Sequence, residues 1–550
     1  MRKNIFGLIT VLLSVVLCFG GLGCGAGGKE EDKFKTTLYV GTFDNAFGTE
    51  WLRSLKERFE RDYAEVSFEE GKKGVVIDYE PNRGLVGMSS FDTFNYDVVF
   101  TEQLPYYNYV AADQLVDITD IVTTANEDDG GKIIADKMND QQKSGYSVNG
   151  KYYALPHTSG SMALFYDVDM FVRNSLYFDV NGRFTNGNDA QKSAGPDGQL
   201  GTYDDGLPAT IAQLKSLCEE MSDQGINPLN YAGSVNEYVS LWLTTLVLNL
   251  VPEEESELLW SLSGSSSTLI DAINSDGSLT FKPTTEITSE NGYLIMRQQG
   301  RYEAMKLFQE LFEDGRFYSK SQSTYSHIEA QHDFMKGTYS KINKNGSKIG
   351  LLIEGTWWET ESSSYYEEMV DGGMGDGAAR ENRHFAVMPF PKLDENSLGQ
   401  NIALEWRNST ALIPSRTPEY KIALAKEFLK YCYTDASLND FTRVTGTTIS
   451  INYTVKNEVI NALPSYSKAL IEYNANSKIV LPVSQNEYYL KNQPFFTDNV
   501  YGWQTNTEGL SFRYPTLFMK SNAVKDKTAK TYLEGVWNFY SEQYWANLFK

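Results

Sequence analysis

The chain has 550 residues and a formal net charge of −23 at pH 7, with 41% hydrophobic and 13% aromatic residues. This composition supplies a large apolar core and excludes a chain that is disordered over most of its length. The acidity argues against nucleic acid and anionic lipid as partners, because both repel a negatively charged protein. The length predicts more than one domain.

The N-terminus has the pattern of an export signal. Two basic residues precede an apolar run from Ile5 to Phe19, which is too short for a membrane span. The run ends in Gly21-Leu-Gly-Cys24, which resembles a bacterial lipobox. We therefore expect a signal peptide over 1–23, a lipid anchor on Cys24 at the extracytoplasmic face of the cell membrane, and a flexible tether over 24–35. The alternative is a secreted protein with an unmodified Cys24.

The next part of the chain alternates between strands and helices. A helix is expected over 49–63, and strand-length apolar runs lie at 35–42, 75–79 and 96–101. Such alternation predicts a mostly parallel α/β sheet. Ligands bind beyond the carboxyl ends of such strands, so the loops at 43–48 and 101–103 are the candidate ligand contacts.

A stretch around Pro156 has the pattern of a crossing between two lobes. Gly150 begins a turn into a short aromatic strand, Pro156 ends that strand, small polar residues follow, and a second apolar strand ends at Tyr166. The same pattern also occurs in ordinary loops, so these residues alone do not decide.

The second half of the chain predicts helices with a few strands. Residues 225–315 are expected to be largely helical. Further strands are expected at 348–358, 384–391 and 408–415, and further helices at 419–433, 459–473 and from 528 to the end. Cys218 and Cys432 lie on apolar helix faces, where a buried thiol and a disulfide are both compatible with the sequence.

Four motifs follow one another along residues 36–455. They are Phe47-Gly-Thr-Glu-Trp51, Tyr96-Asp-Val-Val-Phe100 with Leu115-Val-Asp-Ile-Thr119, Gly150–Pro156 with Ala163–Phe171, and Glu354-Gly-Thr-Trp357 with Val387–Pro391. In this order they resemble the extracellular solute-binding proteins of ATP-driven importers, in the group that handles carbohydrates.

The resemblance implies a type II periplasmic-binding-protein-like fold, in which two α/β lobes are joined by hinge strands and close around a ligand. One lobe would hold residues 36–156 and 392–447. The other would hold residues 157–391 and 448–550.

The candidate ligand-binding residues combine aromatic rings with planar polar groups, as a sugar requires. In the family the tryptophan of Gly-x-Trp stacks on sugar, and Trp357 takes that position. Neighbouring residues in an extended segment point oppositely, so we expect one of Trp357 and Trp358 to face the cleft and the other to face the core. The other candidates are Asn45, Phe47, Glu102, His157, Ser159, Trp406 and Arg407.

A loop with Asp197, Asp204 and Asp205 interleaved with glycines resembles a calcium loop. It lacks the distal glutamate of an EF-hand, and a solvated turn is the alternative. Calcium would be structural there, and no cofactor is required for function.

The sequence thus predicts a lipid-anchored, monomeric binding subunit of a carbohydrate importer, with an oligosaccharide as ligand and membrane permease subunits as partners. It contains no catalytic motif that we recognise, so we expect no enzymatic activity. The alternatives are a surface-attached glycoside-active enzyme, whose two carboxylates so acidic a chain could supply, and a binding protein for a non-sugar polar solute or a peptide.

Overall fold

The computed structural model of the protein describes residues 32–43, 46–188, 190–313, 323–339, 348–405 and 409–548. The predicted signal peptide, the lipid-anchor residue Cys24 and most of the tether lie outside these ranges. Within them, no helix combines the length and the apolar character that a membrane crossing requires.

The first sheet has five strands in the order β2-β1-β3-β18-β6. They are β1 (Thr36–Thr42), β2 (Val75–Pro81), β3 (Val98–Thr101), β6 (Ala154–Pro156) and β18 (Thr410–Leu412). Strands β1, β2 and β3 are parallel, and β18 is antiparallel to both β3 and β6. The carboxyl ends of β1, β3 and β6 therefore lie at one edge of the sheet.

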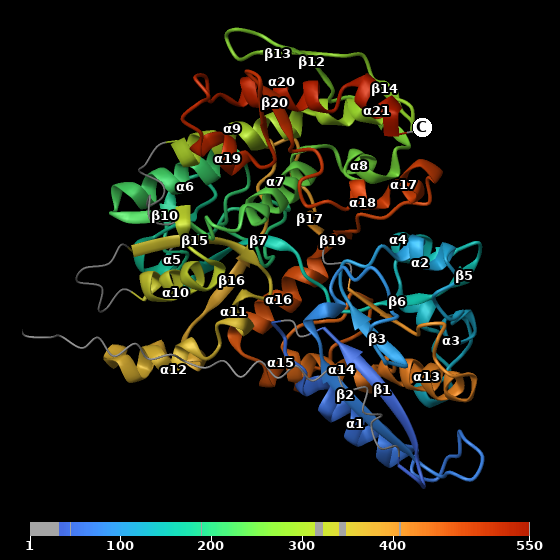
Figure 1. Cartoon of the computed structure of the whole chain (residues 1–550). Helices are drawn as coiled ribbons and strands as arrows, with labels where there is room; N and C mark the ends of the chain where they lie inside the picture. The colour runs from blue at the N-terminus through green and yellow to red at the C-terminus, as the bar shows by residue number, and fades with distance from the viewer. Residues whose placement is uncertain are drawn as a thin grey trace, which may run out of the picture.

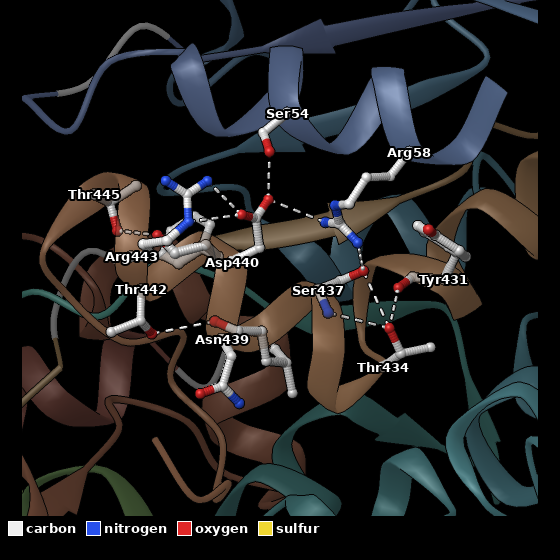
Figure 2. Close-up of polar contacts among 12 residues, drawn as sticks. Ser54, Arg58, Tyr431, Thr434, Ser437, Asn439, Asp440, Thr442, Arg443 and Thr445 are labelled. Carbon is white, nitrogen blue, oxygen red and sulfur yellow. Dashed lines mark hydrogen bonds and ion pairs between the residues drawn. The ribbon is translucent and has the colours of Figure 1, made fainter. Parts of the chain in front are cut away.

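Helix α1 (Glu50–Asp62) buries Trp51, Leu52, Leu55 and Phe59, the stripe that the sequence spacing predicts. It packs against α14 (Asp435–Thr445). Figure 2 shows the polar link between these helices: Asp440 accepts hydrogen bonds from Ser54 (2.5 Å) and Arg58 (3.2 Å), and Arg443 binds its other oxygen at 2.6 Å. Burial alone would raise the pKa of Asp440, but these hydrogen bonds outweigh it and the pKa is lowered.

The second sheet has the order β10-β15-β7-β16. Its strands are β7 (Met162–Asp167), β10 (Ile226–Tyr231), β15 (Lys348–Gly355) and β16 (Phe385–Met388). Helix α7 (Asn236–Leu250) contacts β7 and β15 and is buried along almost its whole length, as expected for a helix that is apolar on every side. The two sheets form separate parts of the molecule, the blue one below and the green and yellow one above in Figure 1.

Residues of three segments lie side by side between these two parts. Residues 157–161 join β6 to β7, Ser409 directly precedes β18, and residues 448–450 follow α14. The backbone N–H of His157 donates to the backbone carbonyl of Ser409, and the backbone N–H of Ser450 donates to the backbone carbonyl of His157, each at 2.8 Å. The structure confirms the α/β prediction and the two-lobe fold with crossing strands.

Strand β17 (Asn401–Leu404) pairs in parallel with β19 (Ser477–Val480). The Asn249 side chain in α7 donates to the Ile402 carbonyl at 2.8 Å. Residues 401–404 thus lie beside a helix of the second sheet, although the sequence grouped 392–447 with the first lobe. The residue-by-residue division into lobes stays a prediction.

Residues 225–315 depart from the largely helical expectation. Besides β10 they contain four short strands in two antiparallel pairs: β11 (Gly264–Ser266) with β14 (Thr285–Ile287), and β12 (Ile270–Ile273) with β13 (Leu279–Phe281). Gly277 has φ 82°, which allows the tight turn between β12 and β13. The serine, threonine and isoleucine residues here favour such strands over a helix.

The sequence predicts helices at 419–433, 459–473 and from 528 to the end, and the structure has helices in each of these ranges as well as several elsewhere. The remaining helices are α2 (Tyr106–Ala111), α3 (Thr119–Thr123), α4 (Asp140–Tyr146), α5 (Val168–Asn174), α6 (Ile211–Asp223), α8 (Leu258–Ser261), α9 (Gln299–Glu313), α10 (His327–Thr338), α11 (Trp358–Glu361), α12 (Tyr365–Met369), α13 (Glu419–Cys432), α15 (Asn457–Ala462), α16 (Ser465–Asn476), α17 (Glu487–Lys491), α18 (Gln493–Phe496), α19 (Pro515–Lys520), α20 (Ala529–Phe539) and α21 (Glu542–Leu548). Cys218 in α6 and Cys432 in α13 are free and buried, so the thiol alternative applies.

Four short strand pairs complete the described elements. Their members are β4 (Ser147–Val148) with β5 (Lys151–Tyr152), β8 (Tyr177–Phe178) with β9 (Phe184–Thr185), and β20 (Thr505–Thr507) with β21 (Leu510–Phe512), in addition to β17 with β19.

A segment near the C-terminus contacts the part of the molecule that holds the first sheet. The main chain of Leu481 exchanges two hydrogen bonds with the side chain of Gln141 in α4, at 2.8 and 2.9 Å. Gln485 donates to the carbonyls of Ser144 and Ser147 at 2.6 and 2.8 Å. We call residues 481–485 the C-terminal clasp.

Candidate functional site

A small cavity of about 10 Å³ lies at the carboxyl edge of the first sheet. Phe47 follows β1, Glu102 follows β3, Thr158–Gly160 belong to the first crossing, and Trp357 follows β15. The cavity therefore brings together both lobes and the hinge. Of the residues that the sequence proposed for ligand binding, Phe47, Glu102, Ser159 and Trp357 meet here.

Gly355 determines where the indole of Trp357 can lie. A β-carbon at position 355 would come within 2.1–2.3 Å of three ring carbons of Trp357, so only glycine allows the ring to lie across the end of β15. Trp357 is 2% exposed, and its ring centroid is 6.2 Å from that of Tyr238. The rigid aromatic wall of the cavity thus depends on a glycine two residues earlier.

Trp358 lies in the core of the second lobe. It is 0% exposed, and its ring packs against Phe165, Phe334 and Phe385 with centroids 5.1–5.8 Å apart. It is the first residue of α11, and Trp357 is the N-cap of that helix. We therefore remove Trp358 from the candidate ligand contacts and keep Trp357.

His157 also lies outside the cavity. Its ring is packed between Trp51, Phe100 and Phe441, with centroids at 5.0, 4.6 and 5.5 Å. This burial lowers the pKa of His157 to about 3, so the imidazole is neutral at pH 7. Its backbone belongs to the crossing segment, whereas its side chain stabilises the core beneath the sheet edge.

Glu405 is a residue of the site that the sequence reasoning missed. It is 3% exposed, and its Oε2 accepts hydrogen bonds from the Ser159 hydroxyl (2.7 Å) and from the Gly160 N–H (2.6 Å). A buried carboxylate thus fixes the cavity floor to the second crossing. A charged residue directly before a predicted crossing strand was the available signal. The predicted contacts Asn45, Trp406 and Arg407 lie outside the described residues.

The three aspartates of the predicted calcium loop bind the loop itself. Asp197 accepts from the N–H of Gln199 (2.7 Å), Asp204 from the N–H of Asp197 (3.0 Å), and Asp205 from the N–H of Gly201 (2.8 Å). Burial raises the pKa of Asp204 to about 6. Within the described ranges, no group of three or more His, Cys, Asp or Glu side chains could hold a metal ion.

The cavity offers an aromatic plate, a carboxylate, a hydroxyl group and a polar backbone. An apolar ring face can pack on the C–H surface of a neutral polyhydroxylated molecule, while the carboxylate and hydroxyl groups bind its rim. The arrangement is therefore suited to hold a polar, uncharged, ring-shaped solute.

The chain shares its two-lobe α/β fold with solved structures of solute-binding proteins. The apo-form of RafE from Streptococcus pneumoniae has a TM-score of 0.54 and 14% identity, over 94% of this chain and 100% of that one. The SBP RafE in complex with raffinose has a TM-score of 0.52 with the same identity and coverage.

A chitin oligosaccharide binding protein has a TM-score of 0.51 and 13% identity, over 93% of this chain and 99% of that one. At these identities the likeness establishes the fold alone. No family model and no curated protein matches the sequence.

Proposed function

We propose that the protein is the substrate-binding subunit of an ATP-driven carbohydrate importer and that it binds an oligosaccharide between its lobes. One observation carries this proposal: Phe47 and Glu102 from one lobe and Trp357 from the other line a single cavity at the hinge. Support comes from the fold, which is shared with proteins that bind raffinose and chitin oligosaccharide.

In this proposal a sugar ring packs on the indole of Trp357, and its hydroxyl groups bind Glu102 and Ser159. The cavity has a volume of about 10 Å³, which is room for about one water molecule, whereas typical ligand sites have roughly 300–1,000 Å³. A disaccharide therefore requires the lobes to move apart before it can enter. Closure around the ligand would then present a shape that the permease recognises, while other subunits hydrolyse ATP.

A panel of sugars tests the binding proposal. A ligand that binds only the folded state increases the free energy of unfolding by RT ln(1 + [L]/Kd), and it therefore raises the melting temperature. Thermal unfolding should be followed with raffinose, chitotriose and maltotriose, and each hit confirmed by calorimetry. Binding should be lost in Trp357→Ala and retained in the control Phe281→Ala, which truncates an aromatic ring that is 44% exposed. Failure of every sugar in the panel to raise the melting temperature would contradict the proposal.

The same samples separate binding from catalysis. Incubation with each bound sugar, followed by chromatography, should return the sugar intact. Release of shorter products would favour the glycoside-active enzyme instead.

Membrane attachment through Cys24 and calcium in the 197–205 loop are further proposals. Cys24→Ala should move the protein from the membrane fraction to the soluble fraction. Calcium should raise the melting temperature relative to chelator if the loop holds the ion. No difference would support the solvated turn, in which the carboxylates accept hydrogen bonds from the loop itself.

A further inference from the structure

The floor of the Trp357 cavity is held from two sides. Residues 158–160 line the cavity, and Ser161 follows them. On one side, the backbone N–H of Thr356 donates to the carbonyl of Ser161 at 2.9 Å, and the N–H of Ser161 donates to the Thr356 hydroxyl at 3.3 Å. The Tyr466 hydroxyl in α16 donates to the Thr356 carbonyl at 2.6 Å. Because Trp357 directly follows Thr356, the floor and the aromatic wall are fixed relative to each other.

On the other side of the floor lies the buried side chain of Glu405. Its Oε2 accepts hydrogen bonds from the Ser159 hydroxyl and from the Gly160 N–H. The backbone N–H of Glu405 donates to the carbonyl of Val480, the last residue of β19, at 2.9 Å. The carboxylate therefore links the floor to the chain directly after β17. Hinge closure rotates whole lobes about such connecting segments, so we expect this link to persist when the lobes move.

These contacts determine how Ser159 can bind a ligand. A hydroxyl group has one hydrogen to donate and two lone pairs that accept, whereas an ionised carboxylate only accepts. The hydroxyl hydrogen of Ser159 is therefore directed to Glu405, and the lone pairs are left for other groups. The N–H of Gly160 is engaged by the same carboxylate oxygen. Both of these donors in the floor are thus used within the protein.

We infer that Glu405 is a positioning residue that makes Ser159 a hydrogen-bond acceptor toward the ligand. This inference rests on the proposed function, in which a sugar hydroxyl group binds Ser159. The ligand group at this position must then supply the hydrogen. A free hydroxyl or amino group does so, whereas an ether oxygen, a methylated hydroxyl group or fluorine cannot. Glu405 therefore selects sugars that are unsubstituted at one hydroxyl group, although it acts through Ser159.

The test uses analogues of whichever sugar binds among raffinose, chitotriose and maltotriose. In each analogue, one hydroxyl group is replaced either by hydrogen, which gives the deoxy sugar, or by fluorine, which can accept but cannot donate. Calorimetry on the full chain should find a position at which both analogues bind wild type about tenfold more weakly than the parent sugar, because both lack the donor hydrogen.

Variants of the two residues assign this position. Ser159→Ala should bind the parent sugar about tenfold more weakly, and both analogues at that position should then bind within about twofold of the parent. Glu405→Ala releases the Ser159 hydrogen, so the fluorinated analogue should bind at least about twofold more tightly than the deoxy analogue. Glu405→Gln keeps an oxygen for both hydrogen bonds and should restore equal binding of the two analogues. Glu395→Ala removes an exposed carboxylate elsewhere and should match wild type.

Three results would overturn the inference. Parent-like binding of a fluorinated analogue, at the position assigned by Ser159→Ala, would show that Ser159 donates to the ligand. Equal losses in wild type and Ser159→Ala at every position would show that Ser159 makes no contact. A folded Glu405→Ala variant that keeps the wild-type pattern would show that Glu405 does not orient Ser159.

The first two results come from wild type and Ser159→Ala, so they do not depend on the folding of Glu405→Ala. In all three cases wild type still binds the parent sugar, and the proposed function stands. Absence of binding by every sugar would refute the proposed function, and the role of Glu405 with it.

Discussion

Gly355→Ala is expected to disable the cavity without altering any group that contacts the ligand. The new β-carbon would lie 2.1–2.3 Å from the ring of Trp357, whereas ordinary van der Waals contact begins at 3.4 Å. The indole must therefore move by about 1 Å. Because Trp357 is 2% exposed and enclosed by its neighbours, this movement has to displace packed side chains as well.

The expected cost follows from overpacking, which typically destabilises a protein by about 1–3 kcal/mol. Urea unfolding should show a lower midpoint with an unchanged slope, because the surface exposed on unfolding stays the same. Calorimetry with a sugar from the panel should show an affinity weaker by about two- to thirteenfold, since loss of a well-placed aromatic contact costs about 0.5–1.5 kcal/mol.

Gly399→Ala is the matched control. A β-carbon at this position meets no atom within 4 Å, and its φ lies outside the left-handed region, so stability should change by less than about 0.5 kcal/mol. The reasoning is refuted if Gly355→Ala unfolds and binds like wild type, or if the control is damaged to the same degree.

Three further predictions concern the core. The pKa of His157 is about 3 when folded and near 6.5 when unfolded, so only the unfolded state gains a proton between these values. The contribution of His157 to the free energy of unfolding should be fully present above pH 6.5, and it should fall by up to about 1.4 kcal/mol per pH unit below that pH. In urea titrations at pH 7 and 4.5, His157→Phe should remove this part of the pH dependence. Asp440→Asn should lower the free energy of unfolding by about 1–3 kcal/mol at pH 7. The difference from wild type should shrink as the pH falls from the ordinary pKa of an aspartate, about 3.9, through the lowered pKa of Asp440; a constant difference would contradict the ion-pair account. A thiol reagent should label neither Cys218 nor Cys432 in the native protein and both after unfolding, because burial raises the pKa of each thiol and shields it.

The sequence predicts the first sheet well because local patterns determine it. The stripe Trp51, Leu52, Leu55 and Phe59 has helical spacing, and the runs around it alternate as strands do, so each element can be assigned from its own residues. The same holds for the crossing at Pro156, where the strand-ending proline and the small residues are adjacent in sequence.

The site is predictable only in part, because it depends on distant packing. Alternation predicts that Trp357 and Trp358 face different ways, but Trp358 becomes core through contacts with residues as far away as Phe165. His157 is close to the cavity in sequence, yet its ring turns beneath the sheet edge because three aromatic rings enclose it.

The short strands between residues 264 and 287 show the same limit. Each has only three or four residues, and its neighbours on both sides are helical. Pairing of β11 with β14 brings together residues about twenty positions apart, and local periodicity contains no information about a partner strand at that distance.

The C-terminal clasp lies outside the cavity, but its contacts can affect the apparent affinity for a ligand. Its hydrogen bonds to α4 link the two lobes in the arrangement described here. When a ligand binds only one arrangement, the apparent dissociation constant equals the intrinsic one divided by the population of that arrangement. If the protein binds a ligand as proposed, sequence changes at Gln141 or Gln485 would change this population and therefore the apparent affinity, while the residues that line the cavity stay the same.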